Sequence, residues 1–88
     1  MNDKNSAELF KIIGRNVKYY RKLYNLKYGK MTQEDLAEIV DVSTSLIGGL
    51  ESDKIEQGIS VYNLWKISRA LKVPIESFFD ESDFGSRF

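Results

Sequence analysis

The sequence predicts an all-α domain made of five short helices. Three observations support this fold class. The chain has 88 residues, the size of one small domain, and 42% of them are hydrophobic, as in an ordinary globular protein. Apolar residues recur at steps of three and four, which is the spacing of a helix that buries one face. No run of alternating β-branched residues predicts a strand, and one proline and six glycines are the main interruptions.

The first helix is expected to open near Asn5 or Ser6, because Asn5 and Glu8 have the spacing of a capping box. Asn25 suits the left-handed conformation that ends a helix, and residues 26–31 then form a connecting loop. The buried stripe of this helix is expected to consist of Leu9, Ile12, Ile13, Val17, Tyr20 and Tyr24.

Two more helices follow at short spacing. Thr32 is a good N-cap, with Asp35 three residues later, and the helix that it starts stops at Asp41, a residue that tolerates a turn conformation. Ser43 caps the next helix, which covers residues 44–51. The apolar face is Leu36, Ala37, Ile39 and Val40 in the first of these helices and Leu46, Ile47 and Leu50 in the second.

The last two helices are separated by a proline. Ser60 caps a helix over residues 61–72, which ends before Pro74 because proline disfavours helical geometry in the preceding residue. The buried positions of this helix are Leu64, Trp65, Ile67, Ser68 and Leu71. Pro74 then suits the start of a fifth helix carrying Ile75, Phe78 and Phe79. The chain therefore divides into an N-terminal arm with the start of the first helix (1–8), a domain (9–79) and an acidic C-terminal tail (80–88).

Charge is distributed unevenly although the net charge is zero, with 13 basic and 13 acidic side chains. Residues 1–31 carry eight bases and two acids, a balance of +6, whereas residues 32–60 carry one base and seven acids, a balance of −6. Such asymmetry indicates either a partner surface or basic and acidic elements that pack side by side.

The composition excludes several functions. The chain contains no histidine and no cysteine, so imidazole catalysis, thiolate metal sites and disulfides are ruled out. We expect no enzymatic activity, no metal and no cofactor, because a glycine-rich phosphate loop is also missing. The sequence has neither an apolar stretch of about 18 residues nor a signal-peptide pattern. A cytoplasmic protein with no membrane partner and no evident small-molecule ligand is therefore expected.

Residues 33–52 have the pattern of two short helices joined by a tight turn. Ala37 is small where the two helices would cross, and Val42 and Ile47 would fill the space between them. This spacing is typical of a helix-turn-helix, whose second helix can enter the major groove of DNA.

With these residues the chain resembles the Cro/repressor-type (XRE) helix-turn-helix family of phage repressors and bacterial regulators. The resemblance covers roughly residues 12–79. The residues that carry it are 32–38 (TQEDLAE), Val42 and Ser43 with Ile47, Leu50 and Glu51, and Leu64 with 66–73 (KISRALKV). The resemblance implies a compact five-helix lambda-repressor-like domain. It also implies a sequence-specific transcriptional regulator, a repressor, that binds double-stranded DNA as a homodimer.

The resemblance implies roles for individual residues. Gln33, at the start of the second helix, is expected to meet a DNA phosphate with its side chain and backbone amide, as the positive end of a helix favours. Arg21 and Glu51 match a pair that forms an internal salt bridge in many relatives. Arg21 also lies on the flank of the apolar stripe, and a half-buried arginine needs an acidic partner. The recognition helix is expected to contact DNA through Ser43, Thr44, Ser45, Gly48 and Gly49.

The sequence departs from the family in three ways. The stretch between Arg21 and Gln33 is longer than in relatives, by roughly residues 26–30. Residues 32–52 contain five acids and no lysine or arginine. Gly48 and Gly49 each cost about 1 kcal/mol in a helix interior. These glycines either let the backbone approach DNA or a partner closely, or mark a recognition helix that has degenerated.

Three lysines are candidates to supply the missing phosphate-binding charge: Lys27 and Lys30 in the inserted segment, and Lys54 after the recognition helix. The alternative is that they are ordinary solvated loop charges. Phe84 and Phe88 have no obvious core position and are candidate dimer contacts. The acidic motif and the paired glycines also keep open a second function, a protein-interaction module on the same fold with weak or lost DNA binding.

Overall fold

The computed structural model of the protein describes residues 3–82. This part of the chain forms four α-helices and one 3-10 turn: α1 (Asp3–Lys27), α2 (Gln33–Val40), α3 (Thr44–Glu51), α4 (Val61–Leu71) and η1 (Ile75–Phe79). Residues 3–82 contain no strand, so the all-α class is confirmed. The expected fifth helix is present only as the short turn η1.

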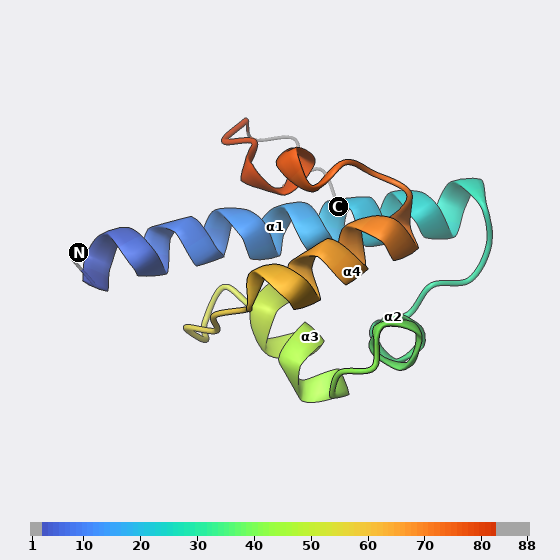
Figure 1. The fold of residues 1–88 in the computed structure, drawn as a ribbon, viewed down its shortest axis with the longest axis horizontal. Helices are drawn as coiled ribbons and strands as arrows, with labels where there is room; N and C mark the ends of the chain where they lie inside the picture. Colours follow the sequence, from blue (N-terminus) through green and yellow to red (C-terminus); the bar gives the residue numbers. More distant parts are fainter. Residues whose placement is uncertain (1–2, 83–88) are drawn as a thin grey trace.

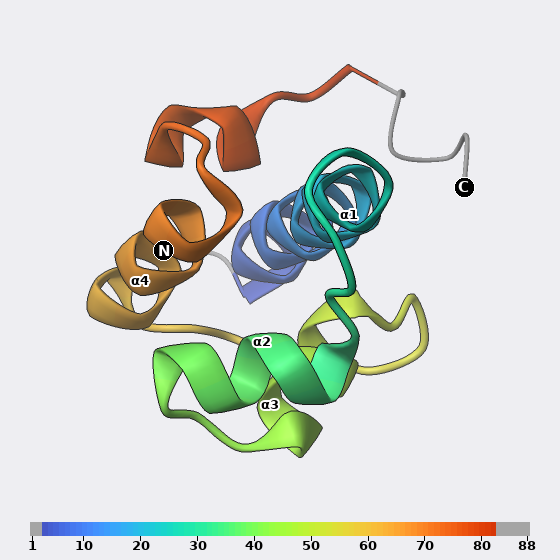
Figure 2. The same cartoon turned by 90° about the vertical axis from the view of Figure 1, so that its right-hand side faces the viewer.

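Helix α1 forms the long axis of the domain (Figure 1). It packs against α3 on one side and against η1 on the other, and α4 lies along it between these two contacts. Helix α2 packs on α3 and α4 (Figure 2). The helix-turn-helix pair α2–α3 therefore forms one edge of the molecule and is held there by α1 and α4.

The start of α1 differs from the prediction. The helix already begins at Asp3, so Asn5 and Glu8 lie inside it and do not form the expected capping box. Residues 3–8 are therefore part of the helix.

The end of α1 also differs from the prediction. The helix continues past Asn25 to Lys27, and Gly29, with a φ of 141°, forms the turn that follows. The side-chain oxygen of Asn25 instead accepts the backbone N–H of Met31 at 2.7 Å. Met31 is buried in the core, so the inserted segment is fastened to the domain at its far end.

Helices α2 and α3 begin and end where the sequence predicted, whereas α4 begins as predicted at Val61 but ends one residue early, at Leu71. Thr32 and Asp35 form a reciprocal capping box, with hydrogen bonds of 3.0 and 2.9 Å. Ser43 and Ser60 each accept a backbone N–H three residues further along, at 3.0 and 3.1 Å. Asp41 ends α2 in the left-handed conformation, with a φ of 58°. These caps are formed by neighbours in the sequence, which is why they were predictable.

The core draws on every element. Its buried hydrophobic members are Ile13, Val17, Met31, Leu36, Ala37, Val40, Ile47, Leu50, Leu64, Ile67, Leu71 and Phe78. Helices α1 and α3 approach most closely at Gly14, where an added Cβ would overlap the backbone carbonyl oxygen of Leu50. A glycine at this position is therefore a packing requirement for the position of α3.

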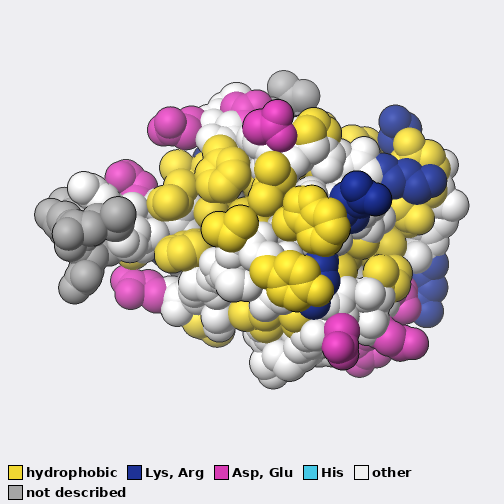
Figure 3. Space-filling model, viewed as in Figure 1, with side chains coloured by type: hydrophobic (Ala, Val, Ile, Leu, Met, Phe, Trp, Pro, Cys, Tyr) yellow, Lys and Arg dark blue, Asp and Glu magenta, His cyan; other side chains and the backbone are white. Residues whose placement is uncertain are grey.

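Three residues assigned to the core are exposed instead. Leu9, Ile39 and Trp65 keep 41%, 60% and 46% of their surface exposed. In α1, Phe10 packs against the core in place of Leu9, its neighbour in the sequence. Ile39 and Trp65 lie together beside a hollow between α2 and α4. Figure 3 shows that hydrophobic side chains gather on the face of the molecule that α4 presents.

A buried asparagine in α1 fixes η1, and sequence reasoning missed it. Asn16 is fully buried, and its side-chain N–H groups donate to the backbone carbonyls of Phe78 at 2.9 Å and Asp80 at 2.7 Å. Phe78 inserts its ring into the core beside Tyr20. The turn after α4 is therefore held by both polar and apolar contacts.

Candidate nucleic-acid interface

The turn between α2 and α3 has the compact geometry that the motif predicted. The backbone N–H of Val42 donates to the carbonyl of Ala37 at 3.0 Å, which closes the end of α2. Ala37 and Ile47 are buried, and Val42 packs against the core. The two helices therefore form a rigid pair, which places the start of α3 in a defined position.

A buried ion pair anchors the other end of α3. The guanidinium of Arg21 donates two hydrogen bonds to the carboxylate of Glu51, from Nε and Nη2, each at 2.8 Å. Its Nη1 donates to the Met31 carbonyl at 3.0 Å. The side chains are 11% and 1% exposed, so the pair expected from the sequence is present and almost dry. Two parallel hydrogen bonds to one carboxylate give the pair a fixed geometry.

Gln33 is part of the same network. Its side-chain N–H donates to Glu51 Oε1 at 3.1 Å, and its side-chain oxygen lies next to Gly48. The amide side chain is therefore turned toward α3, whereas the sequence analysis expected it to meet a phosphate. The N–H of Asp35 is used by the Thr32 cap, so the backbone N–H groups of Gln33 and Glu34 are the ones that this helix end offers to an anion.

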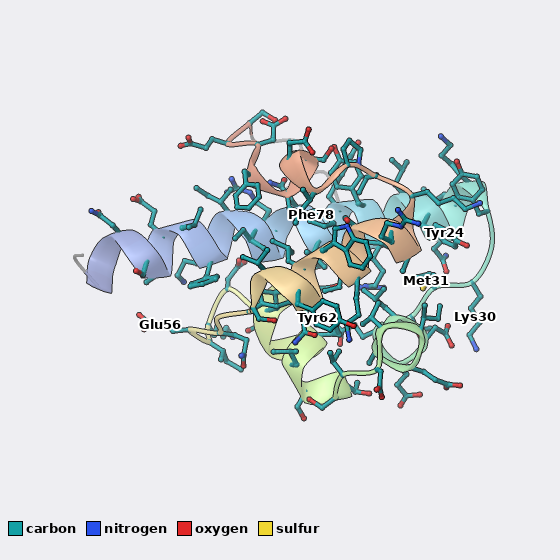
Figure 4. The ribbon with its side chains drawn as sticks, in the orientation of Figure 1. Tyr24, Lys30, Met31, Glu56, Tyr62 and Phe78 are labelled. Atoms are coloured by element: carbon teal, nitrogen blue, oxygen red, sulfur yellow. The ribbon has the colours of Figure 1, made fainter. Side chains whose placement is uncertain are left out.

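A groove of about 780 Å³ runs between the end of α1, the inserted segment and the starts of α2 and α3. Its lining residues are Arg21, Lys22, Asn25, Leu26, Lys30, Met31, Thr32, Gln33, Glu34, Asp35 and Thr44. Two lysines, Lys22 and Lys30, therefore stand beside two helix N-termini. In Figure 4 the side chain of Lys30 projects from the connecting segment at the edge of the molecule.

The expected DNA-contacting lysines are not brought together. Lys30 lines the groove, but Lys27 lies on another side of α1, beside a small hollow that also includes Lys72. Lys27 and Lys72 both approach the ring of Tyr28, at 5.6 and 4.6 Å from its centroid. Lys54 is exposed in the loop after α3. Lys22 was missed because its place in the groove depends on where the connecting segment and α2 lie beside α1.

The recognition helix presents few side chains. Thr44 and Ser45 are exposed at the start of α3, and Ser43 is also exposed but uses its hydroxyl as the cap. Gly48 is half-buried beside Gln33.

Gly49 is buried, and a Cβ there would lie only 3.0 Å from the side-chain oxygen of Gln57. Gln57 covers Gly49, so the expected DNA contact of Gly49 would require this side chain to move. Alanine at this position would require only a small shift of the Gln57 side chain, so this contact alone does not demand a glycine. Phe84 and Phe88, the candidate dimer contacts, lie outside the described residues.

Other kinds of site find no support in the described part of the chain. Residues 3–82 contain no cluster of acidic residues arranged to hold a metal ion. None of the described helices is long and apolar enough to span a membrane.

Comparison with known proteins identifies the family. A family model described as helix-turn-helix matches residues 17–78, which is well over half of the chain. The chain belongs to the Cro/C1-type (XRE) helix-turn-helix family, whose domain is a DNA-binding regulatory domain and not a catalytic one. Membership implies binding to double-stranded DNA. Neither the curated proteins nor the solved structures gave a match.

Proposed function

We propose that this protein is a sequence-specific transcriptional regulator, a repressor, that binds double-stranded DNA as a homodimer and inserts the start of α3 into the major groove. The observation that carries the proposal is the groove in which Lys22 and Lys30 stand beside the N-termini of α2 and α3. Free backbone N–H groups, two helix dipoles and two ammonium groups at one place favour a phosphate, and they must outweigh the carboxylates of Glu34 and Asp35, which line the same groove. A repressor needs only to occupy its operator on the DNA. A cytoplasmic location is consistent with this role.

The buried network supports the proposal mechanically. Because Glu51 holds both Arg21 and Gln33, the ends of α2 and α3 are fixed relative to α1 before DNA arrives. A phosphate bound at the start of α2 then sets how deeply α3 enters the major groove of DNA. Thr44 and Ser45 remain to contact base edges. Short hydroxyl groups discriminate bases less well than a bidentate side chain, so base readout at each position is expected to be modest.

Selection from randomised duplexes at physiological salt tests this function. Enrichment of a palindromic site is the expected result, because a symmetric dimer reads two half-sites one helical turn apart. Failure to enrich any duplex would contradict the proposal. It would favour the second candidate, a protein-interaction module, which the exposed acids Glu34, Glu38 and Asp41 of the helix-turn-helix support.

The two lysines of the inserted segment offer a matched test of the groove. In Lys30→Ala, the slope of log K against log[salt] should become shallower by nearly one, because one phosphate contact is lost. Lys27→Ala removes the same charge from the same segment but on a side away from the groove, and should leave the slope unchanged. Equal effects of the two variants would show that only the general charge of the segment matters.

A further inference from the structure

The C-terminal end of α2 and the outer face of α4 form one exposed surface, which we call the α2–α4 face. It comprises Glu38, Ile39, Asp41, Tyr62, Trp65, Lys66 and Arg69. Figure 2 shows that the C-terminal end of α2 lies on the same side of the molecule as α4. A hollow between the two helices is lined by Ile39 and Trp65 together with Lys66 and Arg69.

The centre of this face is apolar and aromatic. Ile39 and Tyr62 are 60% and 65% exposed, and the rings of Tyr62 and Trp65 stack with centroids 6.4 Å apart. A preformed aromatic pair of this kind presents a large apolar area with little conformational freedom left to lose on binding. Figure 3 shows hydrophobic side chains gathered close to lysine and arginine side chains on the side of the molecule that α4 presents.

The two helices of the face carry opposite charges. On α4, Lys66 and Arg69 lie over the rings of Tyr62 and Trp65, at 4.7 and 5.4 Å from the centroids, and α4 contains no acid. The end of α2 carries Glu38 and Asp41, and no base stands in its last turn. These acids are next to the negative end of the helix dipole, where a carboxylate is unfavourable. Within residues 3–82, neither these acids nor the two cations take part in an ion pair.

We propose that the α2–α4 face is a twofold-symmetric interface between two copies of this chain. A surface with an apolar centre, a basic side and an acidic side is complementary to itself after a twofold rotation. The rotation stacks the two apolar centres together. It also brings Lys66 and Arg69 of each copy against Glu38 and Asp41 of the other, so that the acids at the end of α2 gain cationic partners. The composition of the α2–α4 face supports the proposal, since tryptophan, tyrosine and arginine are the residues enriched at binding hot spots.

The interface leaves the proposed DNA-binding groove open. The groove lies at the N-terminal end of α2, where Gln33 and Thr44 line it, and the α2–α4 face includes only the C-terminal end. The proposal thus goes beyond DNA binding, and self-association is measured without DNA. The proposal rests on the homodimer of the proposed function and names its interface: a dimer that survives the charge reversals overturns this interface and leaves the dimer standing, whereas failure to select a DNA site leaves self-association untouched.

Charge reversal provides a specific test, with sedimentation velocity of the full chain over a concentration series. The chain should be a dimer, and Glu38→Arg and Arg69→Glu should each weaken self-association by about tenfold or more, because like charges then face each other. The double variant E38R/R69E should dimerise again. An equimolar mixture of the two single variants should form a heterodimer, since one copy is then basic at both contacts and the other acidic at both.

Matched controls and a second measurement complete the test. Glu34→Arg and Lys54→Glu make the same charge changes at exposed positions outside the face and should leave the dimer intact. Trp65 is the only tryptophan of the chain, so its fluorescence should change with concentration in the natural chain and much less in Arg69→Glu. A monomer at all concentrations overturns the proposal. So does a dimer that survives both single variants, or one that is lost only in F84A/F88A.

Discussion

The two ends of α3 are built in opposite ways. The C-terminal end is packed on Gly14 of α1 and locked by the buried pair of Glu51 and Arg21. The N-terminal end exposes only Thr44 and Ser45, with a serine cap. Most interactions of α3 therefore fix its position, and few of its side chains are available to contact DNA bases. Variants at the packed end should therefore alter folding, and variants at the exposed end should alter DNA binding alone.

The largest effect is expected from Glu51→Ala. The substitution leaves the guanidinium of Arg21 nearly dry and without its carboxylate, and breaking a buried pair in this way costs about 3–5 kcal/mol. Urea unfolding of the variant should show a correspondingly lower free energy of unfolding. Replacing both partners with apolar residues of similar size should recover a large part of the loss, because no buried charge then remains. If the free energy of unfolding of Glu51→Ala falls by less than about 1 kcal/mol, the C-terminal end of α3 is not held by this ion pair.

Gly14→Ala should also be severely destabilising. A Cβ at this position would overlap the Leu50 carbonyl, so α1 and α3 must move apart, at a cost of about 3 kcal/mol or more. Gly48→Ala is the matched control, since its Cβ would meet only the flexible end of the Gln33 side chain at 3.3 Å. Helix propensity then favours alanine by about 1 kcal/mol. The same substitution should thus shift the thermal midpoint in opposite directions at the two glycines.

Thr44→Ala tests the exposed end of α3. Stability should remain within about 0.5 kcal/mol of the natural chain, because the side chain is on the surface. DNA affinity should fall by about 1 kcal/mol at the selected site, with a smaller loss on unrelated duplexes. A competition assay between the two duplexes measures the difference. Equal losses on both would show that Thr44 contacts only the backbone.

The smallest effect on stability is expected when the pH is lowered. Hydrogen bonds from the backbone and side chain of Thr32 hold the pKa of Asp35 below its ordinary value of 3.8, and the charge of Lys30 adds to this. A carboxyl whose pKa is lowered on folding contributes stability that is complete above its ordinary pKa and is lost as pH falls through the lowered value. The natural chain should therefore lose part of its stability below about pH 4, and this part of the loss should be missing in Asp35→Asn.

Local features of the chain were predictable, and features that depend on distant contacts were not. The caps at Thr32, Ser43 and Ser60 were correct because each uses atoms three residues away. Leu9 and Trp65 have the spacing of core residues but are exposed, since burial depends on which element covers which face. The periodicity of a helix specifies an apolar stripe, but its width and ends are set by the neighbouring helices.

The residues of the candidate site also divide into those that the sequence predicted and those that depend on distant contacts. The sequence and its family resemblance led to Gln33, Thr44, Ser45 and the Arg21–Glu51 pair, because a motif of fixed spacing carries these positions. The separation of Lys27 from Lys30 was not predictable, since two more residues of helix at the end of α1 rotate one away from the other. Lys22 and Asn25 line the groove because the connecting segment and the start of α2 lie beside them.

The sequence by itself therefore determined the all-α class, the limits of α2 and α3 and membership of the helix-turn-helix family. Hydrogen-bond caps, turn residues and motif spacing are short-range properties, so they can be read along the chain. The tertiary structure alone decided that Gly14 is a packing site and that Gly49 is buried, that Lys30 and Lys22 share a groove, and that the α2–α4 face stays uncovered. The physical reason is that burial and proximity between distant residues arise only when whole helices pack against one another.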